Sequence, residues 1–197
     1  MFDLPDDVER QVQLESGASS GDVRGKRGFD IVCAALLLLP LAVVALCLAV
    51  LNPVLNPGPV FFRQIRMGRN CAPFVALKFR TMTVRDDGNR GAFDAVELAR
   101  VTCLGWFLRR TRVDELPQIL NVLCGEMSMI GPRPDAYGHA QVYLRDIPGY
   151  RRRHKVRPGI TGYAQTEVGY VETLADMQRK VAADLAYLAD PSWRMDL

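Results

Sequence analysis

The chain has 197 residues, of which 49% are hydrophobic, and a formal net charge of +3. This length fits one domain, and the composition excludes a disordered chain, a collagen-like fibre and a small disulfide scaffold. The charge is unevenly distributed, because residues 1–23 have a net charge of −5 and the remaining residues a net charge of +8. A basic body behind an acidic segment indicates an anionic partner, such as a phosphorylated ligand, an anionic lipid or a nucleic acid.

The cysteines and histidines form no pattern for a disulfide framework or a zinc site. The five cysteines include no CxxC pair and are odd in number, which is typical of reduced thiols in a cytosolic redox environment. With only two histidines, the sequence does not favour a zinc site built from cysteine and histidine ligands.

The first 58 residues contain an acidic tail and a membrane element. Residues 1–23 have no hydrophobic periodicity and contain Gly and Ser clusters, so we expect a mobile tail there. Residues 24–58 are expected to form the membrane element, because Ile31 to Leu51 is a run of 21 residues without a charge. A buried core helix and a cleaved signal peptide fit less well, because the run has no polar face and no cleavage pattern follows it.

Pro40 lies near the middle of the apolar run and bends the helix, because it has no N–H to donate to Leu36 O. Each half is too short to cross a bilayer, which favours a re-entrant hairpin that enters and leaves by one face. Basic residues flank the run on both sides and mark both ends as cytoplasmic. They are Arg24, Lys26, Arg27, Arg63, Arg66 and Arg69. A spanning helix that is kinked at the proline is the alternative.

Lys26, Arg27 and Asp30 are the candidate anchoring residues at the mouth of the hairpin, together with Pro40. Asp30 follows the two basic residues at helical spacing, which predicts an ion pair on one helix face. Such a pair would lower the cost of holding a carboxylate near lipid.

The segment after the hairpin contains two predicted strands and a polar loop. The strands are expected at residues 60–65 and 74–79, and the loop covers residues 83–95. Asp86 and Asp87 in this loop form a candidate cation site, although a solvated loop is the favoured interpretation.

Three helices are predicted in the rest of the chain. The first covers residues 97–110 and faces either the core or, through Trp106 and Phe107, the lipid surface. The second begins near Val113, and the last covers residues 174–188.

Asp114 and Glu115 stand among three arginines at the predicted start of the second helix. One interpretation is structural, with Asp114 as the N-cap and Glu115 as a first-turn acid. The other is chemical, because a helix N-terminus and clustered arginines attract phosphate, and an ionised aspartate held there can attack phosphorus. Repulsion between aspartate and phosphate would then require a divalent cation, for which Mg²⁺ is the natural choice.

Six motifs follow one another in a fixed order and carry a resemblance to a known family. They are Lys26-Arg27 with Asp30, KFRTM at 78–82, LRRTRVDELPQ at 108–118, NVLCGEMS at 121–128 leading into GPRP at 131–134, VRPGITG at 156–162 with Gln165, and finally Lys180, Asp184 and Tyr187. Behind a proline-broken apolar hairpin, this series resembles the monotopic phosphoglycosyl transferases, the bacterial sugar transferase family. The similarity covers residues 25–197.

The resemblance implies a fold and a location. The fold is a small membrane-associated α/β domain with a re-entrant helix-break-helix and interfacial amphipathic helices. Residues 59–197 would form the catalytic domain on the cytoplasmic face of the bacterial inner membrane. Membrane lipid is then a partner and nucleic acid is not, while a homodimer is left open.

The resemblance also implies the reaction. A sugar 1-phosphate moves from a UDP-sugar to polyprenyl phosphate, expected to be undecaprenyl phosphate, and UMP is released through a covalent phosphosugar on Asp114. This Mg²⁺-dependent transfer is the first membrane step in the assembly of an exopolysaccharide, a capsule, an O-antigen or a glycoprotein glycan. The sugar and the pathway are not readable from the sequence.

Particular residues acquire roles from the same resemblance. Asp114 is the expected nucleophile and metal ligand, and Glu115 the second catalytic residue, acting in metal placement or proton transfer. The expected substrate-binding residues are Lys78, Arg80, Arg109, Arg133, Arg157 and Asp184. The chain departs from the family pattern at Leu39, where a serine is common, and at Arg112, where a small hydroxyl residue is common.

Two other classes of function are compatible with parts of the sequence. A membrane-tethered basic binding module would use the basic run at residues 151–155, but the run has no interleaved aromatic residues and no nucleic-acid-binding motif. A regulatory subunit with a decayed active site would not require the intact Asp114-Glu115 pair.

Overall fold

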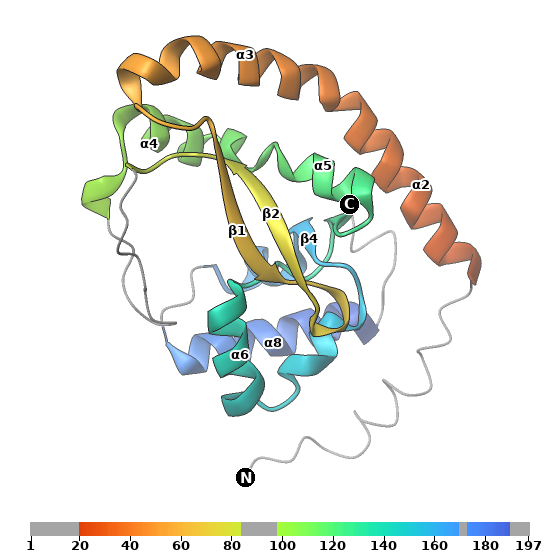
Figure 1. Ribbon diagram of the computed structural model, residues 1–197. Helices are drawn as coiled ribbons and strands as arrows, with labels where there is room; N and C mark the ends of the chain where they lie inside the picture. The colour runs from red at the N-terminus through yellow and green to blue at the C-terminus, as the bar shows by residue number, and fades with distance from the viewer. Residues whose placement is uncertain (1–19, 84–97, 170–172, 190–197) are drawn as a thin grey trace.

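A computed structural model describes residues 20–83, 98–169 and 173–189 of the chain. Two helices, α2 (Ser20–Leu36) and α3 (Leu38–Leu55), form a long curved arch over the rest of the described chain (Figure 1). Inside the arch lie shorter helices and two small sheets. The prediction of a mixed α/β domain with an N-terminal apolar helical element is confirmed in this form.

The helical arch is interrupted close to the predicted position, but not at the proline itself. The irregular turn lies at Leu37, three residues before Pro40. The proline ring clashes with the carbonyl of Leu36 and leaves it without an N–H partner, so the helix deviates in the preceding turn. The second helix also continues beyond the predicted end of the apolar run at Leu51, as far as Leu55.

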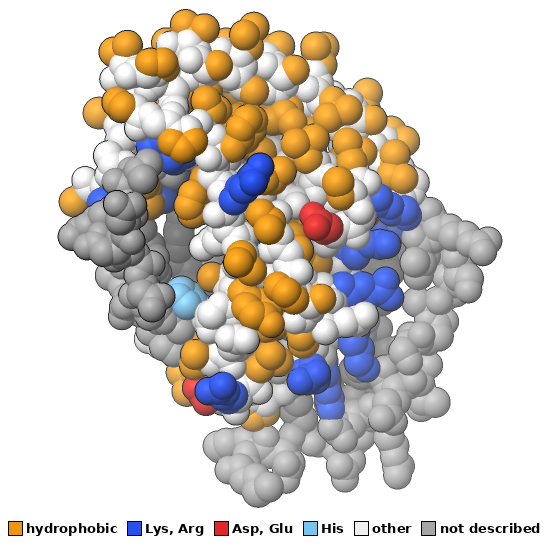
Figure 2. Space-filling model, viewed as in Figure 1, with side chains coloured by type: hydrophobic (Ala, Val, Ile, Leu, Met, Phe, Trp, Pro, Cys, Tyr) orange, Lys and Arg blue, Asp and Glu red, His pale blue; other side chains and the backbone are white. Residues whose placement is uncertain are grey.

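The arch presents most of its apolar side chains outward. Residues Gly25–Leu55 are long and apolar enough to cross a membrane by length and composition, and only 17% of the most apolar stretch is buried. This low burial contradicts the alternative of a buried core helix. Figure 2 shows the hydrophobic side chains over the arch. The most exposed large ones are Leu36, Leu39, Leu46, Val50 and Val54.

A two-stranded antiparallel ribbon descends from the arch. It consists of β1 (Phe61–Met67) and β2 (Pro73–Phe79), each shifted by one or two residues from its predicted bounds. Phe62 lies opposite Lys78 and Arg66 opposite Phe74, so these residues share one face of the ribbon. This is the face on which the candidate site is built.

The second sheet and the remaining helices complete the body. Strand β3 (Ser128–Ile130) pairs in parallel with β4 (Gly159–Thr161). The α-helices are α4 (Cys103–Arg110), α5 (Gln118–Cys124), α6 (Tyr137–Asp146), α7 (Tyr163–Glu167) and α8 (Leu174–Ala189). The 3-10 helices are η1 (Arg69–Cys71), η2 (Leu98–Arg100), η3 (Val113–Glu115) and η4 (Tyr150–Lys155).

The helix predicted at residues 97–110 is shorter in the structure. Val101 forms an antiparallel bridge with Met82, and Thr102 Oγ1 accepts a hydrogen bond of 3.0 Å from Gly105 N. A bridging residue and an N-cap both require extended backbone, so the α-helix begins only after them.

Several other predictions can be compared with the described residues. Helix α8 matches the predicted last helix to within one residue. The five cysteines form no disulfide bonds, as predicted. The acidic tail lies outside the described residues except for its last four, which begin α2, and Asp86 and Asp87 also lie outside them.

Two hydrophobic clusters hold the body together. One packs the underside of the arch against β2 and α5, with Ala34, Phe79 and Ile119 each at most 1% exposed. The other joins the far end of β1 to α6, η4 and α8, around the fully buried Tyr150. The candidate site lies on the ribbon that connects these two clusters.

The start of the arch is fixed to the body by the predicted anchoring residues. Arg27 donates to the carbonyls of Val122 and Leu123 over 2.7 and 3.1 Å, which satisfies the C-terminal end of α5. Lys26 Nζ donates to Tyr187 Oη over 2.6 Å.

The ion pair predicted for Asp30 is wrong within the described part of the chain. Asp30 is 2% exposed, and its Oδ1 accepts from Ser128 Oγ over 2.9 Å and from Met129 N over 2.8 Å. The carboxylate is thus satisfied by the start of β3 and not by its helical neighbours, because a backbone N–H and a hydroxyl are already aimed at its position.

Candidate active site

Asp114 and Glu115 lie on η3, the 3-10 turn between α4 and α5. Arg112 takes a left-handed conformation with φ 59°, which turns the chain sharply after α4. Glu115 N donates to Arg112 O over 3.2 Å and closes the turn. Both acids point inward, with Asp114 8% and Glu115 7% exposed. The alternative that Asp114 caps the following helix is wrong, because Pro117 occupies that position.

Glu115 is held by cations from two other elements. Lys78 Nζ on β2 donates to Glu115 Oε1 over 2.9 Å. Arg133, in the segment after β3, binds Glu115 through both terminal nitrogens, with Nη1 2.8 Å from Oε2 and Nη2 bonded to Oε1. Burial alone would raise the pKa of Glu115, but the hydrogen bonds and charges of Arg133 and Lys78 outweigh it and lower the pKa to about 2. Glu115 is therefore ionised at neutral pH and orients both cations.

Asp114 has one carboxylate oxygen without a partner. Its Oδ1 is buried and accepts no hydrogen bond from the described residues. Burial raises the pKa of Asp114 above its usual value, while the charges of Lys78, Arg109 and Arg112 act in the opposite direction. A buried carboxylate oxygen without a hydrogen bond is costly in free energy, so it marks a position where a ligand completes the site. We call Asp114, Glu115, Lys78 and Arg133 the dyad cluster.

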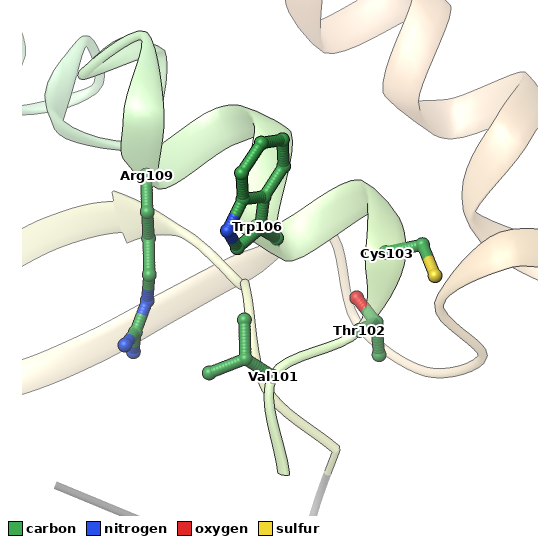
Figure 3. Close-up of a pocket in the computed structure, with 5 residues that line it drawn as sticks. All are labelled: Val101, Thr102, Cys103, Trp106 and Arg109. Atoms are coloured by element: carbon green, nitrogen blue, oxygen red, sulfur yellow. The ribbon is translucent and has the colours of Figure 1, made fainter. Parts of the chain in front are cut away.

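Arg109 connects the dyad cluster to an apolar pocket. Its Nε donates to Thr81 Oγ1 over 2.8 Å, and no residue in the described part of the chain bonds to the terminal nitrogens of the guanidinium. The pocket has a volume of about 490 Å³ and an open mouth. Figure 3 shows Arg109 extending down from one end of α4, the Trp106 ring lying across the middle of the helix, and Val101 below the helix. Cys103 lies farther along the same helix.

Helix α4 has both the core-facing side and the exposed apolar side that the sequence left open. Leu108 is 3% exposed and packs in the core, whereas Trp106 and Phe107 are each 56% exposed. The Arg110 guanidinium lies over the Trp106 ring, 5.1 Å from its centroid. An exposed aromatic pair beside arginines is the composition expected of an interfacial helix.

Arg66 lies beside the dyad cluster, whereas its position in the sequence indicated only a basic residue flanking the apolar run. Its Nε and Nη2 donate to Gln64 Oε1 over 3.0 and 2.8 Å, and its Nη1 donates to Pro134 O over 2.6 Å. Burial, and then the charge of Arg133, lowers the pKa of Arg66 to about 10. The period-2 alternation of β1, in which residues 62, 64 and 66 share a face with Lys78, is the signal that could have identified it.

Three predicted substrate-binding residues are not brought into the dyad cluster. Arg157 Nε donates to Gly125 O over 2.8 Å, near the base of the arch. The guanidinium of Arg80 is occupied by the backbone carbonyls of three residues at the end of the arch and after β2. They are Asn56, Pro59 and Met82. Asp184 lies in a separate charged group.

This separate group, which we call the α8 cluster, consists of Asp135, Tyr150, Arg153, Lys180 and Asp184. Arg153 pairs with Asp135, and its Nη2 lies 2.7 Å from Asp184 Oδ2. Lys180 Nζ and Tyr150 Oη donate to Asp135 over 2.6 and 2.8 Å. Although burial raises it, the charges of Lys180 and Arg153 hold the pKa of Asp135 well below its usual range. Arg153 also donates to Arg133 O over 2.7 Å and so joins the two clusters.

The dyad cluster fits a site for a phosphorylated ligand and a magnesium ion. Lysine and arginine donors beside a carboxylate with an unpartnered oxygen offer charge-assisted hydrogen bonds to phosphate. The described residues contain no group of three or more His, Cys, Asp or Glu side chains able to hold a metal ion. Mg²⁺ is commonly bound by one or two carboxylates together with substrate phosphates and water, so Asp114 Oδ1 suits it without such a group.

An exposed apolar arch beside a site with clustered cations and carboxylates is typical of proteins that act on phosphorylated ligands at a membrane. Comparison with protein families identifies the family: residues 22–197 match the bacterial sugar transferase model, and the chain belongs to this family. The resemblance inferred from the motifs is thereby confirmed.

Characterised relatives carry specific names. The chain is 45% identical over 174 residues to the UDP-glucose:undecaprenyl-phosphate glucose-1-phosphate transferase of Escherichia coli K12, covering 87% of this chain and 38% of the relative. It is also 45% identical over 172 residues to a protein of that name from Caulobacter vibrioides, covering 86% of this chain and 64% of the relative. The exopolysaccharide production protein PSS of Rhizobium leguminosarum bv. phaseoli is 42% identical over 178 residues, covering 87% and 89% of the two chains. The chain thus spans less than two thirds of the first two relatives and most of the third.

Proposed function

We propose that this protein is a phosphoglycosyl transferase that moves a sugar 1-phosphate from a UDP-sugar to a polyprenyl phosphate, expected to be undecaprenyl phosphate. The observation that carries the proposal is the unpartnered, buried carboxylate oxygen of Asp114 among Lys78, Arg109 and Arg112. The names of the relatives support the donor and acceptor classes. The sugar that is carried stays open, because relatives of similar identity are named for glucose and for N-acetylgalactosamine.

In the first step, the Asp114 carboxylate attacks the phosphorus that bears the sugar. The new bond joins an Asp114 oxygen to this phosphorus, and the bond from phosphorus to the bridging oxygen breaks. The bridging oxygen keeps the electron pair and leaves on UMP, so no proton has to be transferred. Lys78 and Arg133, which Glu115 already orients, donate hydrogen bonds to the phosphoryl oxygens as charge develops on them.

In the second step, an oxygen of polyprenyl phosphate attacks the same phosphorus, and the bond to Asp114 breaks. The carboxylate is regenerated and the sugar becomes linked to the lipid through a diphosphate. Arg109 suits the acceptor, because its free guanidinium nitrogens lie beside the apolar pocket lined by Val101 and Trp106. The guanidinium would bind the lipid phosphate and the pocket the first isoprene units.

Mg²⁺ would be held by Asp114 together with oxygens of the donor and water. When bound, it reduces the repulsion between a carboxylate and a diphosphate and stabilises the charge on the transferring group. Glu115 is not a second ligand in this proposal, because both of its oxygens are engaged by Lys78 and Arg133.

The proposed location is the cytoplasmic leaflet of the inner membrane, with α2 and α3 as a re-entrant hairpin. The exposed apolar arch and the exposed aromatic residues of α4 support the membrane association, and the basic residues on both sides of the apolar run support the re-entrant form. We expect single cysteines at Gly25 and Pro59, introduced in a cysteine-free variant, to react with a membrane-impermeant thiol reagent only from the cytoplasmic side. Reaction of one position from the opposite side would instead indicate a spanning helix.

The proposal is tested by trapping the covalent intermediate. Purified protein is incubated with Mg²⁺ and a panel of radiolabelled UDP-sugars without acceptor, and the adduct is mapped by mass spectrometry. We expect a phosphosugar on Asp114, release of UMP, and transfer of the sugar phosphate when polyprenyl phosphate is added. Asp114→Asn should lower turnover by about 10³-fold or more, since an amide is not a nucleophile.

Asp146→Asn is the matched control, because Asp146 is exposed on α6 and makes the same change of charge. This variant should keep full activity. Label on a residue other than Asp114, or full turnover by Asp114→Asn, would refute the nucleophile assignment. Absence of UMP release with every donor would refute the proposed function.

A further inference from the structure

Arg66 carries a positive charge that no carboxylate balances directly. Among the described residues, its hydrogen bonds go to Gln64 Oε1 and Pro134 O, and no acidic oxygen lies within 4.0 Å of it. Its side chain is half-buried beside Arg133, a like charge. A desolvated guanidinium next to another cation is unfavourable unless an anion joins it, so the position indicates a ligand that the protein does not supply.

The Arg66 guanidinium is held in a defined orientation. Gln64 accepts from two of its five N–H groups and Pro134 O from a third, which leaves two N–H groups for a ligand. The strand is also fixed at this point, because Arg66 forms a backbone bridge with Ala136 and Met67 N donates to Asp135 O over 3.1 Å. A preorganised pair of N–H groups matches a phosphate, which accepts such pairs in the plane of the guanidinium.

Arg66 lies farther from the arch than Lys78 on the same face of the ribbon. Lys78 is opposite Phe62, near the start of β1, whereas Arg66 is opposite Phe74, four residues farther along the strand. The charge of Lys78 acts on Asp114, while the charge of Arg133, which binds Glu115, acts on Arg66. Because β1 descends from the arch, its far end with Arg66 points away from α3 (Figure 1).

We propose that Arg66, oriented by Gln64, binds the phosphate of the nucleoside monophosphate leaving group. The inference rests on the proposed function and adds a specific ligand to the same site. Asp114 attacks the phosphorus that bears the sugar, so the other phosphate of the donor must lie beyond it. Arg66 is the cation that follows Lys78 along this face of the ribbon in the direction away from the arch. When the bridging oxygen leaves with its electron pair, Arg66 receives the additional negative charge on UMP.

Gln64→Glu is the most specific test, because it replaces the side-chain amide by a carboxylate of nearly the same shape. The new carboxylate would bind Arg66 as an internal counterion in competition with phosphate. We expect UMP, titrated into the full-length protein in detergent or nanodiscs, to bind about 10- to 100-fold more weakly, the range of one charge-assisted hydrogen bond. If Arg66 were only structural, this variant would bind UMP as the wild type does.

Arg66→Gln should weaken UMP binding by a similar factor. Arg63→Gln is its matched control, because Arg63 lies on the same strand and loses the same charge but is exposed on the opposite face. This control should bind UMP like the wild type. If Arg66→Gln does not fold, Gln64→Glu still decides the question.

A second measurement separates nucleotide binding from general damage to the site. Protein already loaded with labelled phosphosugar is freed of nucleotide and then mixed with polyprenyl phosphate. The variants at Gln64 and Arg66 should transfer the sugar phosphate at the wild-type rate, since the leaving group is absent, although they load slowly. The inference would be overturned if the variants lost rate equally in loading the phosphosugar and in transferring it to polyprenyl phosphate. Wild-type UMP affinity in both variants would also overturn it. Failure of the wild type itself to release UMP would refute the proposed function instead.

Discussion

Two charged clusters meet at the segment that contains Arg133 and Asp135, and they differ in how well their charges are balanced. The α8 cluster has two carboxylates and two cations, and its central Arg153 is 1% exposed. The dyad cluster also has two carboxylates and two cations, but three further arginines surround it, Arg66, Arg109 and Arg112, and one Asp114 oxygen has no hydrogen-bond partner in the described chain. Equal numbers of opposite charges are typical of a structural role, whereas an excess of cations around a carboxylate is typical of a site that binds an anion.

The largest effect on stability is expected in the balanced cluster. Arg153→Met would leave Asp135 and Asp184 as buried carboxylates with one cation between them. Breaking a buried ion pair by removing one partner costs about 3–5 kcal/mol. We expect a loss of this size in the free energy of unfolding, measured by denaturant titration, together with loss of activity as the protein unfolds.

Arg151→Met is the control for this variant, because Arg151 is exposed on the same 3-10 helix.

Asp184→Asn separates a structural from a substrate-binding role of Asp184. Because Asp184 is 1% exposed and pairs with Arg153, we expect lower stability with an unchanged KM for the donor. A stable Asp184→Asn protein with a raised KM would contradict the comparison of the two clusters.

In the dyad cluster, removing a charge should raise the free energy of unfolding instead of lowering it. Burial raises the pKa of Asp114 in the folded protein, so the ionised form destabilises the fold. We therefore expect Asp114→Asn, although inactive, to raise the free energy of unfolding by up to about 1 kcal/mol at neutral pH. This difference should shrink as the pH falls and disappear only well below 3.8, the usual pKa of an aspartate, where Asp114 is protonated in both states. A marked loss of stability at neutral pH would show that Asp114 has a structural partner.

The sequence was sufficient for the parts of the fold that depend on local patterns. The apolar run predicted a long apolar helical element, alternation predicted the two strands that form the ribbon, and helical periodicity predicted α8 to within one residue. It misplaced the start of α4, because the bridge between Val101 and Met82 is a contact between distant segments. It also placed the break at Pro40, although the distortion falls in the turn before a proline.

The candidate site was predictable only in part, because it too depends on contacts between segments that are distant in the sequence. Motif resemblance selected Lys78 and Arg133, which the structure brings to Glu115 from positions 37 and 18 residues away. The same resemblance could not show that Arg80 is occupied by backbone carbonyls or that Asp184 pairs with Arg153. A charged residue's type is visible in a sequence, but its partners depend on tertiary contacts.

The pH dependence of adduct formation tests the role of Lys78 in the dyad cluster. Burial, and then the charge of Arg66, lowers the pKa of Lys78 to about 8. As the pH rises through this value, Lys78 loses the charge that binds phosphate and orients Glu115, so adduct formation should decline with an apparent pKa near 8. Lys78→Arg keeps its charge and should move this decline upward by about one pH unit or more. The rate of UMP release between pH 6 and 9.5 measures it, and acceptor is omitted so that its own titration does not contribute.

Lys155→Arg is the control for this substitution, since Lys155 is exposed and distant in the chain. This variant should leave the alkaline decline of UMP release near pH 8.

The titration of Lys78 also changes the stability of the fold. Because the pKa of Lys78 in the folded protein is below the value of 10.5 for a free lysine, the folded state binds fewer protons than the unfolded state between these two pH values. Stability contributed by this group therefore rises with pH over the same interval in which activity falls. If activity and stability declined together as the pH rose, the loss of activity would be due to unfolding and not to the titration of Lys78.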